Sequence, residues 1–315
     1  MEKKLVAYYS MEYAIEKDLP IYAGGLGVLA GDYLLEAGKL NSQEGLNYIF
    51  LGLFYGDHLQ NEPGNSGFKP LKDENDEPIW LDIDIAIRPI FAQVWVKDYG
   101  TAKLYLFDTN VTSNETADKE ITKSLYDSNN DVFLKQQLVL AIGSIKLFQR
   151  LNLKPSVHHL NEGHTALTII ALAIDFMDSH PQSNIAEALQ QIKPIIVGTK
   201  HTILHGAGRD ISRTDFERIL GQYAQRHKQN LQELFELGVN HETTDTFSTM
   251  YLLMSNIRSA NCVSKLHCDF EAGVHHKSPL IPITNGINRD HWEAKIWGNA
   301  SLSLGDSDLW KIHQQ

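Results

Sequence analysis

The chain has 315 residues, and its 28 Lys and Arg against 39 Asp and Glu give a formal net charge of −11 with histidine neutral. Hydrophobic residues make up 43% and charged residues 21%, which is typical of a globular protein and excludes a disordered, collagen-like or entirely coiled-coil chain. Because nucleic-acid binding needs clustered Lys and Arg, the acidic balance argues against a nucleic-acid partner.

The sequence also predicts a soluble cytoplasmic protein with no membrane partner. The apolar run closest to a membrane span, residues 166–177, is shorter than the roughly 18 residues required and is interrupted by Thr168 and Asp175. The N-terminal residues reach a Ser and a Glu before the apolar core of a signal peptide can form. Two cysteines, Cys262 and Cys268, in so long a chain are typical of reduced cytosolic thiols.

Short β-rich apolar runs alternate with helical patterns along the chain. Strands are predicted over 5–9, 46–55, 91–96, 102–107, 157–160, 195–200 and 280–284. Helices are predicted over 31–40, 131–151, 165–179, 212–237 and 245–260. The helix over 165–179 is apolar almost all round and should be buried. The polar residues 57–78 predict an exposed loop or hairpin.

This alternation predicts an α/β fold with a doubly wound, mostly parallel sheet. In such sheets, ligands bind in the crevice outside the carboxyl ends of the strands. We therefore expect functional residues to follow predicted strands, and the chain has three conspicuous polar or Gly-rich stretches that lie after strands.

Four glycines, Gly24, Gly25, Gly27 and Gly31, lead into the first helical pattern. Glycine lets backbone amides approach a ligand closely, and amides at a helix N-terminus favour an anion. The dinucleotide-binding turn follows its strand directly, whereas 14 residues separate Tyr9 from Gly24 here, with the spacing G-x-G-x-x-x-G. A nucleotide cofactor, another phosphate or sugar ligand, and a purely structural turn all remain open.

The stretch HHLNEGH over 158–164 joins a predicted strand to the predicted buried helix. A zinc site is disfavoured, because His159 and His164 are five residues apart rather than at the four-residue spacing of a helical ligand pair. Polar residues at a strand-to-helix junction favour a ligand crevice. The alternative is a cluster in which Asn161 or Glu162 caps the helix.

Residues 199–202, Thr-Lys-His-Thr, end the next predicted strand and are followed by the glycines of 206–208. Two such junctions favour one shared cleft. The chain also contains a group of possible metal ligands, Cys262, His267, Cys268, His275 and His276. The C-x5-C spacing of that group matches no zinc pattern, so we expect no metal and place the thiols in a helix and loop. No G-x-S-x-G elbow or P-loop is present.

Five stretches stand in one order across residues 5–292: VAYYSMEYAIEKDLPIYAGGLGVLAGDYL, LYDSNNDVFLKQQLVLAIGSIKLFQRLNLKPSVHHLNEGHTAL, HTILHGAG, ANCVSKLH and ITNGINRDHW. They resemble motifs of the α-glucan phosphorylases, which act on glycogen, starch and maltodextrin, and most closely the shorter bacterial branch. The first resembles the family's opening strand and Gly-rich loop, and the second its long helix and H-L-N-E-G-H junction. The others resemble its T-H-T, N-G-V-S-K-L-H and T-N-G segments.

The resemblance implies the N-terminal portion of a two-domain glycosyltransferase of the GT-B type, with catalysis between the domains. The family transfers a terminal glucosyl unit from an α-1,4-glucan to inorganic phosphate and gives glucose 1-phosphate with retention. Its cofactor is pyridoxal phosphate, bound to a lysine of the C-terminal domain. Allosteric control and a homodimer are further expectations from the family.

By the same resemblance, four residues form the loop at the phosphate and glucose: Gly24, Gly25, Leu26 and Gly27. Glu12 is implied to bind sugar hydroxyls or to order phosphate, and His201 to contact the 6-hydroxyl side of glucose. Glu162 and His164 are implied to line the same cleft. This agrees with an anion at a helix N-terminus and polar groups converging from strand ends.

Some positions depart from the family. Tyr-Asp-Ser-Asn over 126–129 replaces Tyr-Gly-Gly-Asp, and Phe133 and Gln137 replace an Arg and a Glu. No pyridoxal lysine motif is present. The resemblance therefore predicts a GT-B-like domain over 1–285 that binds glucan and phosphate, and the start of an interdomain linker over 286–315. The cofactor domain is then absent, a C-terminal half chain is a candidate partner, and this chain alone is expected to be inactive.

Two other functions stay open beside this one. The chain is alternatively a non-catalytic glucan-binding or regulatory module. It is alternatively an NAD-dependent enzyme that uses the Gly-rich loop, although the predicted second strand, LNYIFLGLFY, ends without the acidic residue that binds a ribose hydroxyl.

Overall fold

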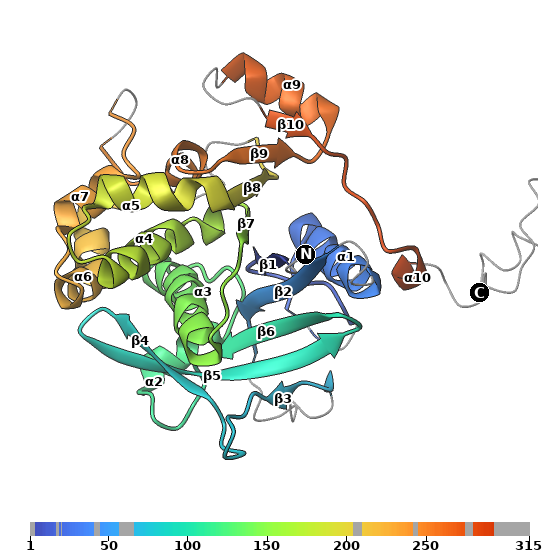
Figure 1. The fold of residues 1–315 in the computed structure, drawn as a ribbon, viewed down its shortest axis with the longest axis horizontal. Helices are drawn as coiled ribbons and strands as arrows, with labels where there is room; N and C mark the ends of the chain where they lie inside the picture. Colours follow the sequence, from blue (N-terminus) through green and yellow to red (C-terminus); the bar gives the residue numbers. More distant parts are fainter. Residues whose placement is uncertain are drawn as a thin grey trace, which may run out of the picture.

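One mixed sheet holds together the residues that the computed structural model describes, which are 4–16, 19, 21–40, 45–56, 66–203, 210–241, 245–274 and 280–292 (Figure 1). Its strands are β1 (Lys4–Tyr9), β2 (Leu46–Leu53), β3 (Lys69–Pro70), β4 (Trp80–Ile85), β5 (Arg88–Tyr99), β6 (Ala102–Asp108), β7 (Val157–Asn161), β8 (Ile196–Lys200), β9 (Ser259–Cys262) and β10 (Leu280–Pro282). Their order is β10-β9-β8-β7-β1-β2-β6-β5-β3, with β4 also paired to β5. The pairs from β10 to β6 are parallel, whereas β5 runs antiparallel to its neighbours.

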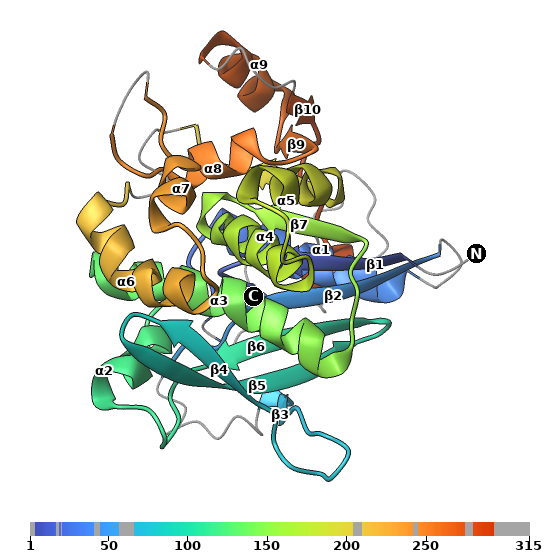
Figure 2. The ribbon, with the colours of Figure 1, turned by 60° about the vertical axis from the view of Figure 1, so that its left-hand side comes forward.

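Helices cover both faces of this sheet at β2 and β6 (Figures 1 and 2). The helix α1 (Gly25–Lys39) connects β1 to β2 and packs on β2, β5 and β6. The helix α3 (Asn130–Leu151) packs on β2, β4 and β6 and contacts α4 (Leu167–Ser179). The other described helices are α2 (Thr116–Lys119), α5 (Ile185–Ile192), α6 (Arg213–Arg226), α7 (Leu231–Glu236), α8 (Thr249–Ser255), α9 (Lys265–Val274) and α10 (Arg289–Trp292).

The predicted α/β fold with a doubly wound, mostly parallel sheet is confirmed. The long helix α3 begins where the Asn129 side chain accepts a hydrogen bond from the Asp131 amide (2.9 Å), which caps the helix. The helix α4 is buried from Leu167 to Ile174, in agreement with its apolar sequence. The helix α1 begins at Gly25, six residues before the predicted start. The prediction begins too late because glycine has a low intrinsic helix propensity, which hides the first turns of the helix in the sequence.

Two predicted helices are wrong in extent. The prediction of one helix over 245–260 is incorrect, since α8 ends at Ser255 and Ser259–Cys262 form β9. That strand, Ser-Ala-Asn-Cys, has no β-branched or aromatic residue, and its pairing with β8 and β10 supplies what its sequence lacks. Residues 212–237 form two helices, α6 and α7. The predicted loop over 57–78 contains β3, and its residues 57–65 lie outside the described residues, as do 206–208, 275–276 and 293–315.

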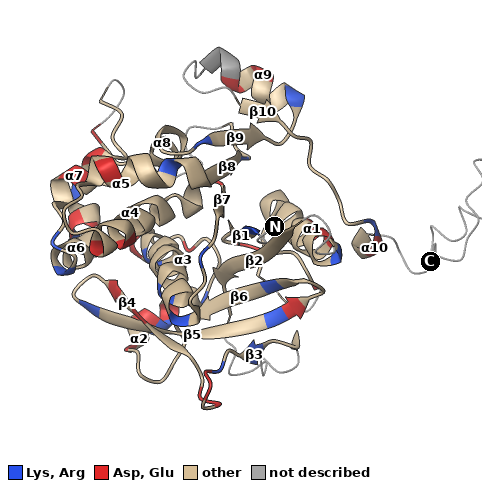
Figure 3. Ribbon diagram, viewed as in Figure 1, with Lys and Arg blue, Asp and Glu red and all other residues tan. Residues whose placement is uncertain are grey.

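Lys and Arg are scattered among Asp and Glu over the described helices and strands (Figure 3). No helix in the described part of the chain is long and apolar enough to cross a membrane.

The helix α1 lies directly on neighbouring backbone at two points. A Cβ atom on Gly31 would lie 1.9 Å from the carbonyl oxygen of Ala14, and one on Gly38 would lie 2.0 Å from the carbonyl oxygen of Tyr99. These distances leave no room for any side chain, and backbone cannot yield as a flexible side chain can. Gly31 therefore sets how closely α1 approaches the loop after β1, and Gly38 sets how closely it approaches the end of β5.

We expect Gly31→Ala to lower the free energy of unfolding by about 3 kcal/mol, because its Cβ forces α1 away from Ala14. The matched control is Gly221→Ala in α6, where a Cβ meets only Leu231 at 3.7 Å and should add about 0.5–1 kcal/mol of stability. Urea unfolding of the two variants and the wild type measures both effects. Equal stability of Gly31→Ala and the wild type would show that α1 is packed more loosely.

Candidate functional site

The candidate site lies where the carboxyl ends of β1, β7 and β8 meet. The strand β1 pairs with β2 on one side, and the chain reaches β2 through α1. On its other side β1 pairs with β7, which in turn pairs with β8. Such a switch point leaves a crevice outside the strand ends in open α/β sheets. Glu12, Glu162 and His201, which follow the three strands, therefore share one rim, as the sequence predicts.

Glu12 fixes the turn that leads into α1. It is only 2% exposed, and its Oε2 accepts hydrogen bonds from the backbone amides of Ala23 (2.6 Å) and Gly24 (3.1 Å). Its Oε1 accepts a hydrogen bond from the Tyr126 hydroxyl (2.7 Å). Gly27 completes the turn, because a Cβ at this position would lie 2.6 Å from Glu12 Oε2. The Gly-rich loop is thus built around a buried carboxylate of the same chain.

The N-terminus of α1 presents amides that the helix does not use. Gly24 is the N-cap in extended backbone, and the first intrahelical bond runs from the Val28 amide to its carbonyl (3.2 Å). The amides of 25–27 therefore have no acceptor within the helix, and the helix dipole makes this end partially positive. No described side chain caps the helix, and the first turn has no acidic residue. A Cβ on Gly25 would meet nothing within 4 Å, so the packing of the chain does not require glycine there.

Glu162 holds the loop after β8. Its Oε1 accepts from the Gly163 amide (3.1 Å), and its Oε2 accepts from the amides of His201 (2.8 Å) and Thr202 (3.0 Å) and from the Thr202 hydroxyl (3.3 Å). Its backbone, at φ 73° and ψ 165°, lies in a region that is essentially restricted to glycine and costs on the order of 1–3 kcal/mol. Four donors, three of them at Oε2, stabilise the buried carboxylate, so Glu162 shapes this rim.

A line of polar side chains connects the strand ends. Asn161 Nδ2 donates to Ser10 Oγ (3.2 Å), and Asn161 Oδ1 accepts from His201 Nε2 (2.7 Å). With its proton on Nε2, the neutral His201 ring carries a lone pair on Nδ1. Burial lowers the pKa of His201, the nearby Glu162 charge opposes that shift, and the ring is half-buried at the rim. His201 therefore offers a neutral hydrogen-bond acceptor rather than a cation at neutral pH.

Aromatic rings close the side of the rim near α3. The His164 ring lies 5.1 Å from the Tyr126 ring and 5.6 Å from the Phe133 ring, measured between centroids. Burial and the Glu12 carboxylate both raise the pKa of Tyr126, which keeps its hydroxyl protonated as a donor. The buried hydroxyl of Tyr55 has no hydrogen-bond partner among the described residues, and burial and then the nearby Glu12 charge raise its pKa.

The structure brings the eight predicted site residues to this one rim. They are Glu12, Gly24, Gly25, Leu26, Gly27, Glu162, His164 and His201. Their contacts with ligand stay predictions. Sequence reasoning missed Tyr126, Asn161, Thr202 and Tyr55 as members of the site. The first three lie within quoted motifs, which was a usable signal, whereas nothing in the sequence around Tyr55 marks its approach to Glu12.

A buried ion pair lies behind His201. Lys200 Nζ and Glu271 Oε2 are 2.6 Å apart and both side chains are almost fully covered. Cys262 and Cys268 are free and buried nearby, and burial raises the pKa of Cys262 to about 12. Within the described residues, no group of three metal-ligating side chains comes together. Cys262 lies in β9 rather than in a helix or loop, which corrects that expectation.

The chain is similar over most of its length to curated proteins, although no family model matches it. It is 31% identical to a maltodextrin phosphorylase of Thermococcus litoralis, covering 98% of this chain and 41% of that protein. It is 27% identical to a glycogen phosphorylase of Aquifex aeolicus, covering 92% of this chain and 44% of that protein. A glycogen phosphorylase of Mycobacterium tuberculosis is 24% identical over 98% of this chain and 40% of its own length.

The chain is a relative of the maltodextrin and glycogen phosphorylases. This finding confirms the resemblance drawn from the five motifs. The chain spans about two fifths of the length of these curated phosphorylases. The alternative of a dinucleotide-binding turn lacks the required geometry, because β1 ends at Tyr9 and α1 begins only at Gly25.

Two neighbouring histidines of β7, His158 and His159, are expected to make stability depend on pH in this phosphorylase relative, because burial lowers the pKa of each. His158 is 3% exposed, and its Nδ1 is 2.7 Å from the Tyr9 hydroxyl oxygen. Burial lowers the pKa of His158 from 6.5 to about 3. Between these two values the unfolded chain binds a proton that the folded chain does not, so the free energy of unfolding falls as the pH falls.

We expect acidification from pH 6.5 to 4.5 to destabilise the wild type by roughly 2 kcal/mol more than His158→Gln, whose side chain cannot titrate. Urea unfolding at several pH values measures the slope for each protein. His180→Gln, at an exposed histidine, is the control and should keep the wild-type slope. Identical slopes in all three proteins would contradict a contribution of His158 to the pH dependence.

Proposed function

We propose that this chain forms the phosphate- and sugar-binding wall of a cytoplasmic α-1,4-glucan phosphorylase. The reaction transfers a terminal glucosyl unit from the glucan to inorganic phosphate and releases glucose 1-phosphate. The observation that carries the proposal is the turn of α1, where Glu12 holds the amides of Ala23 and Gly24 while those of 25–27 have no acceptor in the helix. The relationship to maltodextrin and glycogen phosphorylases supports it.

In this proposal the amides of 25–27 donate hydrogen bonds to phosphate oxygens, and the helix dipole favours the negative charge. The Glu12 carboxylate lies at the same helix end and opposes a second anion, so phosphate alone should bind weakly, with a dissociation constant on the order of millimolar. Sugar hydroxyls would bond to His201 Nδ1 and to Glu12 Oε1, which accepts a hydrogen bond from the Tyr126 hydroxyl and retains acceptor capacity.

The pyridoxal phosphate that the family resemblance implies does not fit the described lysine of this rim. Lys200 lies beside His201, but its ammonium group is buried in an ion pair with Glu271 and is not available to add to an aldehyde. We therefore assign the cofactor to the part of the phosphorylases that these residues do not span. The described residues bind and orient the phosphate and the glucosyl unit in this proposal.

Gly25→Val tests the phosphate site. Its side chain has open space, so the fold should persist, while the branched side chain covers the amides of 25–27. We expect inorganic phosphate to shift the amide NMR signals of these residues in the wild type at millimolar concentration, and at least tenfold weaker binding in the variant. Gly221→Ala on α6 is the control. Equal phosphate affinity with an unchanged thermal midpoint would leave the turn with a structural role only.

A polypeptide made of residues 1–315 should bind phosphate without turnover. Protonation of the leaving glucan oxygen needs an acid within about 3 Å, and the described donors of this rim are backbone amides, hydroxyls and a neutral imidazole. We expect no glucose 1-phosphate from maltodextrin and phosphate above an enzyme-free blank, with pyridoxal phosphate added. Steady turnover in a preparation free of other phosphorylase would reveal a catalytic group among these residues.

A further inference from the structure

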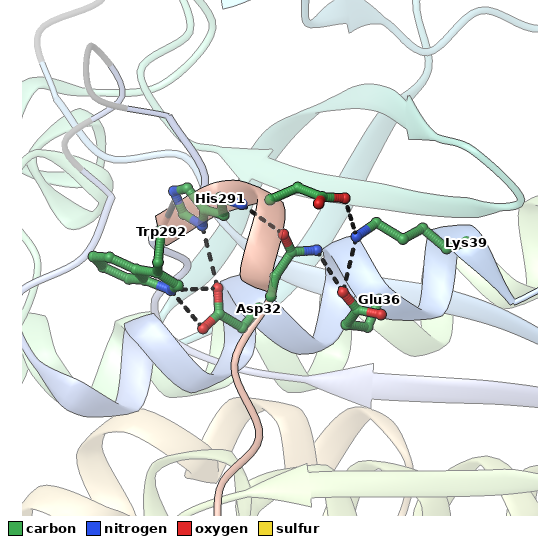
Figure 4. A network of polar contacts seen from close by, with 7 residues as sticks. Asp32, Glu36, Lys39, His291 and Trp292 are labelled. Carbon is green, nitrogen blue, oxygen red and sulfur yellow. Dashed lines mark hydrogen bonds and ion pairs between the residues drawn. The ribbon is translucent and has the colours of Figure 1, made fainter. Parts of the chain in front are cut away.

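The segment after β10 crosses to the other half of the sheet and lies on α1 (Figures 1 and 4). We call residues 288–292 the strap; it contains α10 and ends the described chain. Before the strap, the amides of Ile283 and Asn285 donate to the carbonyls of Cys262 (2.9 Å) and Val263 (3.3 Å), at the end of β9. The segment is thus attached to β9 at one end and to α1 at the other, with β8, β7 and β1 between them in the sheet order.

Asp32 is the centre of the contact between the strap and α1 (Figure 4). Trp292 Nε1 donates to both carboxylate oxygens, at 2.9 and 2.7 Å, and His291 Nδ1 lies 3.2 Å from Oδ1. Asp32 is only 2% exposed although it lies on a surface helix. A buried carboxylate needs donors to offset its lost hydration, and the strap supplies them.

Two further contacts continue the same stripe of α1. Asn288 Nδ2 donates to Glu36 Oε1 (2.8 Å), and Lys39 Nζ donates to Asp290 Oδ2 (2.8 Å). The stripe follows the spacing i, i+4, i+7 from Asp32 and extends about 10 Å along the helix. Asn288 also accepts a bond from the His291 amide (2.8 Å), so the residue that caps α10 also binds α1.

The strap contacts α1 from a second direction. At Gly31 and Gly38, one side of the helix packs directly against neighbouring backbone. Asp32, Glu36 and Lys39, which bond to the strap, lie about 100° around the helix axis from these glycines. A helix fixed from one direction only can still rotate or slide on the sheet. Contacts in two directions restrict both the rotation and the sliding of the helix. This restriction also applies to the N-terminus of α1, which carries the turn assigned to phosphate.

We propose that Asp32 and Trp292 are positioning residues for the phosphate site: through the strap, whose chain is attached to the end of β9, they fix the N-terminus of α1 relative to the rim at β1, β7 and β8. This inference rests on the proposed function, since it assigns the amides of 25–27 to phosphate. It adds that the contact between Asp32 and Trp292, which are 260 positions apart in the sequence, holds those amides in the position that binds phosphate.

The test compares Trp292→Phe with Trp80→Phe in the full chain. Both tryptophans are about half exposed, at 51% and 46%, but only Trp292 donates to Asp32. Phe retains an aromatic ring and removes the indole N–H donor. One readout is hydrogen exchange of the α1 amides, which needs no ligand. The other is the affinity for inorganic phosphate, from the NMR signals of residues 25–27.

We expect Trp292→Phe to speed exchange in α1 at least threefold while β1 and α3 exchange as in the wild type, and to weaken phosphate binding three- to tenfold. Trp80→Phe should change neither. Asp32→Asn, and the double variant of Asp32→Asn and Trp292→Phe, provide a second test. Phe removes the donor of this contact, and Asn removes its negative charge and one of its two acceptor oxygens. The double variant should therefore lose little more phosphate affinity than Trp292→Phe alone.

Unchanged α1 exchange in Trp292→Phe would overturn the inference, and so would exchange that rises equally in β1, α3 and α1, since that indicates general destabilisation. Faster α1 exchange with unchanged phosphate affinity would also overturn it. A wild type that binds no phosphate at the amides of 25–27 refutes the proposed function and, with it, this positioning role. In that case a selective rise of α1 exchange would still show that the strap fixes the helix.

Discussion

Two buried carboxylates organise the rim, and each does so by accepting backbone amides of a neighbouring loop. Glu12 and Glu162 are 2% and 1% exposed, and a carboxylate so buried is costly unless it is fully hydrogen-bonded. Glu12 is satisfied only when the turn before α1 brings its amides inward, and Glu162 only when the loop after β8 does. In each loop, therefore, the backbone amides point toward a carboxylate that follows a strand, and they replace the water that this carboxylate loses on burial.

This arrangement limits what the rim does alone. Glu12 places a negative charge at the positive end of α1, and two unit charges about 6 Å apart still repel by about 3 kcal/mol at an effective dielectric constant of 20. The nearby described cation, Lys200, is committed to Glu271, and burial lowers the pKa of His201, which leaves it neutral. An anion on α1 thus depends on positive charge from outside these described groups, as expected for one wall of a cleft.

The sequence predicts the elements whose signal is local and misses those that depend on distant partners. The periodic apolar positions of α3 and α4 and the β-rich runs of the parallel strands identify the doubly wound sheet. The strand β9 is missed because its four residues are held by neighbours on both sides rather than by their own propensity. Contacts such as Tyr126 with Glu12, and Trp292 with Asp32, join segments more than 100 residues apart, which no local pattern reveals.

The same contacts separate two kinds of residue within one motif. Glu162 has four internal donors and Gly27 is required by the approach of Glu12, so both residue types are explained by the fold itself. At Gly25 no contact within the chain requires a glycine. His201 Nδ1 and Glu12 Oε1 can each accept a further hydrogen bond at the rim. A ligand can use only groups with capacity left over. In the proposed function the α1 amides, His201 and Oε1 of Glu12 therefore contact the ligand, while the rest of the motif holds them in place.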